Sequence, residues 1–176
     1  EIETNNPQVN RLFQNIIWGQ KSNFFDSPTD CPQRDERLGW TGDANVFSNT
    51  ALYNMDVYAF YRKFLKDVAI EQQLNDGRAP MYAPSFGNKD GGGAIWGDAT
   101  TFIPWNAYQV TGDASLLKEH YPSMKDWVDW ITRNTGTENL WTHCSQFGDW
   151  LALDGENPAM PTGKTDEYFI ASIYYH

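Results

Sequence analysis

The sequence has few of the residues that form disulfides, bind metal ions or span a membrane. Only two of its 176 residues are cysteines, Cys31 and Cys144, and neither belongs to a CxxC or a paired Cys/His spacing. This excludes a disulfide framework and a structural zinc site, so we expect two unbridged thiols and no metal or cofactor. No run approaches the ~18 apolar residues of a membrane span, and no signal-peptide pattern is present, so we expect no membrane partner.

Positive charge is also scarce. The chain has 13 Lys and Arg against 23 Asp and Glu, a net charge of −10. Because phosphates would be repelled, we expect no nucleic-acid partner. Aromatic side chains, by contrast, make up 15% of the residues, with eight Trp and nine Tyr. Such rings fill cores, but they also line grooves in which flat apolar faces meet polar ligands.

Helical periodicity dominates the chain. Apolar residues spaced by 3 and 1 predict a helix that begins at Pro7, is capped by Asn6 and could close at Gly19. The same spacing predicts a helix over 56–73. Further helices are expected over 43–55, over 100–112 with Pro104 tolerated only in the first turn, over 113–135 as a helix pair or one kinked helix, and from about 166 onward.

Long loops separate these helices. The segment 75–99 holds two Pro and six Gly, and polar loops are expected over 134–148 and 154–165. Tyr82, Phe86 and Trp96 argue against disorder in the first loop. Because strand signals are sparse, we expect an all-α fold of stacked α-hairpins with the long loops collected on one face.

One stretch, "SPTDCPQRDERLGWTGDANV" at 27–46, concentrates charge without an amphipathic period. Glu36 in it could be a general acid, which a glycosidic oxygen needs because it is a poor leaving group. Neighbouring carboxylates favour the protonated form and neighbouring arginines the ionised form, so spacing leaves the protonation state open. The competing interpretation is a salt-bridge network that caps the next helix. Asp30 and Asp43 could accept hydrogen bonds from sugar hydroxyls, although Asp43 also suits a helix N-cap.

Three tryptophans lie beside Gly and Asp rather than among apolar residues. They are Trp40 in "LGWTGD", Trp96 in "IWGDA" and Trp150 in "FGDWLAL". This setting favours rings presented at a cleft, where they stack on the C–H face of a sugar, although any one of them could be core. His120 is expected at the surface and His143 in a loop, and "DGGGAIWGD" is a weak phosphate-loop signal.

The motif "TDCPQRDERLGWTGD" resembles the catalytic-region signature of bacterial α-L-rhamnosidases, family 78 of the glycoside hydrolases. "AIWGDA", "FGDWLAL" and "TDEYFIASIYYH" are similar to later segments of the same domain, in the same order, so the resemblance covers nearly the whole chain. It implies a six-hairpin α/α barrel (α/α toroid) that removes terminal α-L-rhamnose from glycosides, oligosaccharides or polysaccharides by inversion.

The resemblance also implies roles for single residues. Glu36 is the general acid, although Asp35 beside it could take that place. Asp30, Arg34 and Asp43 resemble the polar contacts to rhamnose, and Trp40, Trp96 and Trp150 the aromatic walls of its pocket.

An inverting enzyme needs a second carboxylate as base. The resemblance places that base beyond His176, with Asp98, Asp149 and Asp166 as the only local candidates. We therefore expect residues 1–176 to be the N-terminal portion of the barrel domain, to carry the acid without its base, to be inactive alone and to self-associate through exposed helix faces.

Two alternatives stay open. The first is a carbohydrate-binding module without catalysis. The second is another α/α-barrel glycosidase or a polysaccharide lyase, and the charge of −10 speaks against a lyase acting on uronates. The aglycone and the compartment (periplasmic, extracellular or cytoplasmic in a bacterium) are left open.

Overall fold

The computed structural model describes residues 2–135, 138–155, 159 and 161–176. These residues form helices and isolated bridges but no strand. The all-α prediction is therefore confirmed. The helices are α1 (Pro7–Asn23), α2 (Thr41–Asn54), α3 (Tyr58–Gln73), α4 (Ala99–Thr111), α5 (Ser115–Thr135) and α6 (Glu167–Tyr175).

The start of α1 is as predicted, but its end is not. Asn6 is the N-cap, its side chain accepts a hydrogen bond from the Gln8 N–H, and Pro7 is the first helical residue. The helix does not close at Gly19 and continues to Asn23, where the Phe24 N–H still donates to Gln20 O at 3.0 Å. The residues after Gly19 are all compatible with a helix, so one glycine did not stop it.

Prediction placed the start of α2 two residues too late. Thr41 begins the helix because its N–H and its hydroxyl both donate to Met81 O, at 2.9 and 2.8 Å. Trp40 is the N-cap, so the alternative role of Asp43 as a cap is wrong, and Asp43 is the third helical residue.

Both internal prolines are accommodated in helices. The segment expected as a pair or one kinked helix is one helix, α5, which contains Pro122. Pro104 lies in the second turn of α4, not the first as expected. His120, expected at the surface, is only 4% exposed because it lies one turn beyond the buried Leu116 on the same face of α5.

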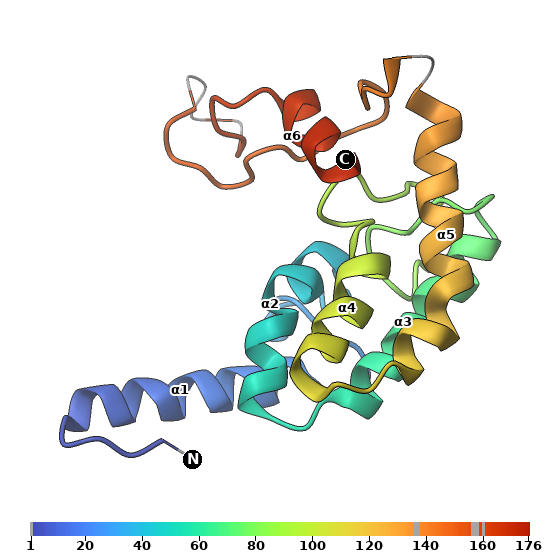
Figure 1. Ribbon diagram of the computed structural model, residues 1–176. Helices are drawn as coiled ribbons and strands as arrows, with labels where there is room; N and C mark the ends of the chain where they lie inside the picture. The colour runs from blue at the N-terminus through green and yellow to red at the C-terminus, as the bar shows by residue number, and fades with distance from the viewer. Residues whose placement is uncertain (1, 136–137, 156–158, 160) are drawn as a thin grey trace.

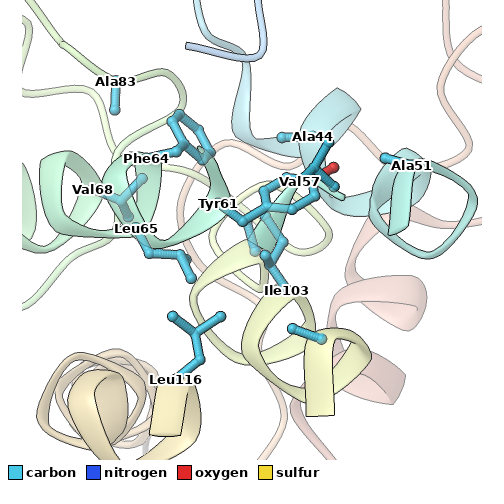
Figure 2. Packing of buried hydrophobic residues seen from close by; sticks show 12 residues of the cluster. Ala44, Ala51, Val57, Tyr61, Phe64, Leu65, Val68, Ala83, Ile103 and Leu116 are labelled. Carbon is cyan, nitrogen blue, oxygen red and sulfur yellow. The ribbon is translucent and has the colours of Figure 1, made fainter. Parts of the chain in front are cut away.

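The main core is formed where α2, α3, α4 and α5 meet (Figure 2). From α3, Tyr61, Phe64, Leu65 and Val68 are all buried, which confirms the apolar face predicted for 56–73. A second cluster lies beside it and includes Trp127, Trp130 and Trp141.

Short and long connections alternate along the chain. Residues 55–57 join α2 to α3 and 112–114 join α4 to α5, whereas 24–40, 74–98 and 136–166 are long. Of the predicted loops 134–148 and 154–165, residues 136–137, 156–158 and 160 lie outside the described residues.

The long loops are hydrogen-bonded to one another. The Ala83 N–H donates to Gly39 O at 3.0 Å, and the Ala94 N–H donates to Gln146 Oε1 at 2.8 Å. The long loops therefore lie together, as expected for stacked hairpins.

Helix α1 is the exception to this packing. It projects away from the other helices (Figure 1), and its apolar residues Val9, Leu12 and Ile16 are 44, 59 and 40% exposed. Its only buried residue is Gln20, which donates to Ala51 O. Among the described residues, no helix combines the length and apolar character needed to cross a membrane.

Candidate active site

The site is built on the tight loop between α1 and α2. The Asp30 N–H donates to Leu38 O at 3.0 Å and closes this loop, and Cys31 and Arg37 in it have positive φ values of 51° and 53°. The Cys31 thiol donates to Asp30 Oδ2 at 3.0 Å, and this bond is the main reason that its pKa is raised. Both cysteines are free, as expected.

Glu36 is held inside this loop. Its Oε1 accepts a hydrogen bond from the Trp40 indole N–H at 2.5 Å and from the Leu38 N–H at 3.3 Å. Its Oε2 is shielded from solvent and has no partner among the described residues. Asp35, in contrast, has a 99% exposed side chain that pairs with Arg37 at 3.4 Å. The geometry favours Glu36 over Asp35 as the acid.

The salt-bridge interpretation of this stretch finds little support. Glu36 forms no ion pair within the described parts of the chain, and Asp35–Arg37 is a solvent-exposed pair of small energetic value. Asp30, Cys31 and Glu36 each place one potential ligand atom within 4.8 Å of the others. Because the Cys31 thiol and Glu36 Oε1 already take part in hydrogen bonds, we assign no metal to this cluster.

Asp43 lies between two cavities. One, of about 250 Å³, is lined by Asp43, Trp96, Asp149 and Trp150 together with Gly42, Val46, Ile95 and Gly148. The other, of about 350 Å³, is mostly apolar, lies between α1 and α2, and is shared with Asp30. Desolvation raises the pKa of Asp43, and the negative charge of Asp30 raises it further. Two carboxylates and two indoles at one cavity suit a polyhydroxylated ligand with an apolar face.

The ring of Trp96 is fixed between α2 and the last long loop. It is 7% exposed, lies 4.2 Å from the Phe147 ring centroid, and meets Trp150 edge-on at 6.3 Å. Gly42 leaves room for it, because a Cβ there would lie 2.5 Å from a Trp96 ring carbon. Trp96 is thus both a wall of the cavity and part of its support, while Trp150 is 43% exposed.

Asp98 anchors the turn that carries Trp96. Its Oδ2 accepts the Ile95 N–H at 2.7 Å, and its Oδ1 accepts the Trp127 indole N–H at 2.8 Å. Asp98 is 4% exposed, and burial raises its pKa to about 6 even though both donors act to lower it. Asp98 therefore has a structural role. Asp166 likewise caps α6, so of the three local carboxylates only Asp149 lines the cavity.

The sequence-predicted residues fall into three groups. Asp30, Glu36 and Trp40 lie together in the first loop, and Asp43, Trp96 and Trp150 share the smaller cavity. Arg34 is exposed, and its side chain forms no hydrogen bond or ion pair within the described residues.

Two aromatic residues were missed. Tyr82 packs edge-on against Trp40 at 5.1 Å, and Phe147 packs against Trp96 with the two rings tilted by 35°. Phe147 stands in the same "FGDW" context that drew attention to Trp150, so that signal could have identified it.

Comparison with known proteins gives a consistent result. Residues 1–176 match the family described as the bacterial alpha-L-rhamnosidase 6 hairpin glycosidase domain. An α-L-rhamnosidase of Alteromonas sp. (strain LOR) is 43% identical over 172 residues, which are 97% of this chain and 18% of that protein.

Two crystal structures are similar in fold as well as in sequence. The α-L-rhamnosidase of Streptomyces avermitilis complexed with L-rhamnose has a TM-score of 0.85 and 41% identity, over 99% of this chain and 16% of that one. The α-L-rhamnosidase of Aspergillus terreus has a TM-score of 0.86 and 42% identity, over 98% of this chain and 20% of that one. The chain thus spans a fifth or less of the length of these relatives.

Proposed function

Because this chain belongs to the bacterial α-L-rhamnosidase six-hairpin glycosidase family, we propose that the complete protein hydrolyses terminal α-L-rhamnosides. Residues 1–176 are proposed as the N-terminal portion of its barrel domain. The observation that carries the proposal is Glu36, a shielded carboxyl held by Trp40 and Leu38. It lies close enough to Asp43, which lines the cavity with the indoles, for its negative charge to help raise the pKa of Asp43.

The proposed chemistry is an inverting displacement. Glu36 donates its proton to the glycosidic oxygen as the bond from that oxygen to the anomeric carbon breaks, and the bonding electrons stay on the departing oxygen. Water attacks the opposite face of the anomeric carbon and passes a proton to a carboxylate base. We propose that this base lies outside these 176 residues, as the resemblance of the motifs implies. Of the three local candidates, Asp98 and Asp166 are engaged in structural hydrogen bonds, which leaves Asp149 at the cavity as the competing assignment.

The sugar contacts are proposed from the same geometry. Asp43 lines both cavities and Asp30 lines the larger one. Their carboxylates can accept hydrogen bonds from rhamnose hydroxyls. Trp96 and Trp150 can pack on the apolar face and the methyl group of the sugar. Arg34 is proposed as a further contact from its place in the motif.

The product identifies the class of function. The complete gene product should release L-rhamnose from an aryl α-L-rhamnoside, and NMR during the first turnovers should show the β anomer. A protein that binds rhamnose and releases none would be a binding module, and an unsaturated, ultraviolet-absorbing product would indicate a lyase. Either result would contradict the proposal.

Self-association is proposed for the 176-residue chain on its own. The exposed apolar face of α1 supports it, because an unpartnered face of this kind favours contact with another surface. Light scattering over a range of concentrations should show a mass above that of the monomer, and a strictly monomeric chain would contradict this.

A further inference from the structure

We propose that Trp40 is a positioning residue for the general acid, and that its indole N–H directs the transferable proton of Glu36 to Oε2. The inference rests on the proposed function. The resemblance implies only that the Trp40 ring is a wall of the sugar pocket. The inference goes further, because it gives the indole N–H of Trp40 a part in the proton transfer.

The two carboxyl oxygens of Glu36 are not equivalent. Oε1 accepts from both the Trp40 indole and the Leu38 backbone, whereas Oε2 is shielded from solvent and has no partner among the described residues. A glycosidic oxygen that takes the proton from Oε2 must therefore displace the groups that cover this atom. A neutral carboxyl has one O–H, and an oxygen that already accepts two N–H donors has little room for it. The proton is therefore expected on Oε2.

The same bonds also stabilise the state that follows the transfer. When the O–H bond of Oε2 breaks and the proton passes to the departing glycosidic oxygen, Glu36 becomes a carboxylate. The Trp40 N–H is then a donor to an anion, and such bonds are stronger than those to neutral groups. The contribution of the indole grows as the proton leaves, which makes it specific to the transition state.

Trp40 itself is fixed by a second loop. Its backbone bridges to Tyr82, its ring packs against that residue, and the adjacent Gly39 O accepts the Ala83 N–H. A Cβ at Gly39 would lie 2.5 Å from Ala83 O, so this approach requires glycine. The indole is thus held from outside the loop that carries Glu36, as a positioning group must be.

The chain offers a matched control in Trp96. It is also a tryptophan at the candidate sugar site, but its indole nitrogen has no hydrogen-bond partner among the described residues. A Trp-to-Phe change therefore removes ring surface at both positions, but it removes a donated N–H only at position 40.

The experiment uses the complete gene product and two substrates. A methyl α-L-rhamnoside needs a proton on its leaving oxygen, whereas a dinitrophenyl rhamnoside leaves as a stable phenolate and does not. Glu36→Gln should lower kcat for the methyl substrate by about 10²–10⁴-fold and spare the dinitrophenyl substrate. Trp40→Phe should follow the same pattern with a smaller loss, roughly 10–100-fold for the methyl substrate. Trp96→Phe should raise KM for both substrates by a similar factor.

The outcomes separate the two claims. Suppose that Glu36→Gln shows the leaving-group dependence but Trp40→Phe lowers kcat equally on both substrates. Trp40 is then only a wall of the sugar pocket, and this inference is wrong. If Glu36→Gln shows no such dependence, the proposed acid itself is wrong. Should Trp40→Phe fail to fold, benzothienylalanine at position 40 replaces the N–H by sulfur in a ring of the same shape. The same selective loss is expected of it, and equal losses on both substrates would overturn the inference.

Discussion

Helices α1 and α3 have the same apolar spacing in the sequence, yet their environments in the structure are opposite. In α3, Phe64 and Leu65 are at most 2% exposed, whereas Leu12 in α1 is 59% exposed. Both faces are helical as predicted. Periodicity thus identifies a helix and its apolar face, but the partner that covers this face must come from elsewhere in the protein.

The comparison extends to how each region is stabilised. Helices α2 to α5, with the turns that cap them, form one packed unit, which we call the α2–α5 block (Figure 1). Helix α1 contacts this block mainly near its C-terminal end, where the Gln20 side chain donates to Ala51 O. A cavity lined by Ile16 and Phe24 lies between α1 and α2. The relatives are five or more times as long as this chain, so they have further residues with which to cover such a face.

The largest expected effect is on the buried face of α3. Leu65→Ala should lower the free energy of unfolding by about 2–5 kcal/mol, because it leaves a cavity in the main core. Urea unfolding followed by circular dichroism measures this. A loss below about 1 kcal/mol would mean that α3 is not packed as described.

The Asp98 carboxyl makes the stability of the α2–α5 block dependent on pH. Its pKa is about 6 in the folded chain and 3.8 as an ordinary side chain. The folded state therefore binds the proton of Asp98 more tightly than the unfolded state does. This tighter binding stabilises the fold fully below pH 3.8, and the stabilisation is lost as the pH rises through 6. Relative to Asp98→Asn, which does not titrate, the native chain should lose about 2–2.5 kcal/mol of stability between about pH 4 and pH 7.

Urea unfolding of both proteins at each pH tests this. The difference between them removes the titration of all other groups, while the constant cost of placing an amide against two N–H donors remains. Parallel stability curves would show that Asp98 is not buried as described.

Two glycines give a matched pair across the same comparison. Gly42→Ala would press a Cβ against the Trp96 ring and should destabilise the chain by about 1–3 kcal/mol. Gly19→Ala in α1 meets nothing within 4 Å and should stabilise it by about 0.5–1 kcal/mol through helix propensity. Equal effects, measured by chemical unfolding, would contradict the packing of Trp96 on α2.

The smallest effect is expected on the exposed face of α1. Leu12→Ala should change the stability of the monomeric chain by less than about 0.5 kcal/mol, since the side chain buries little surface. Unfolding at low protein concentration measures it. A cost near that of Leu65→Ala would show that the α1 face is covered in solution.

What the sequence could predict follows from the range of the forces involved. The cap at Asn6, the face of α3 and the long loops depend on local spacing and composition, and all are present. The start of α2 at Thr41 and the burial of His120 depend on Met81 and on α3–α5 packing, which no local pattern encodes.

The site shows the same division. The crowding of charge around Glu36 was visible, but its partners Trp40 and Leu38 are set by the path of the loop. That Gly42 makes room for Trp96, 54 residues later, could not be read from either position alone.

The central claim is that Glu36, and not its neighbour Asp35, donates the proton. The most direct measurement is kcat of the complete gene product on a phenyl α-L-rhamnoside for Glu36→Gln beside Asp35→Asn. Glu36→Gln should lose about 10²–10⁴-fold while Asp35→Asn, whose side chain is 99% exposed, stays within about twofold of wild type. A Glu36→Gln enzyme that keeps most of its activity, or an Asp35→Asn enzyme that loses it, would contradict the account.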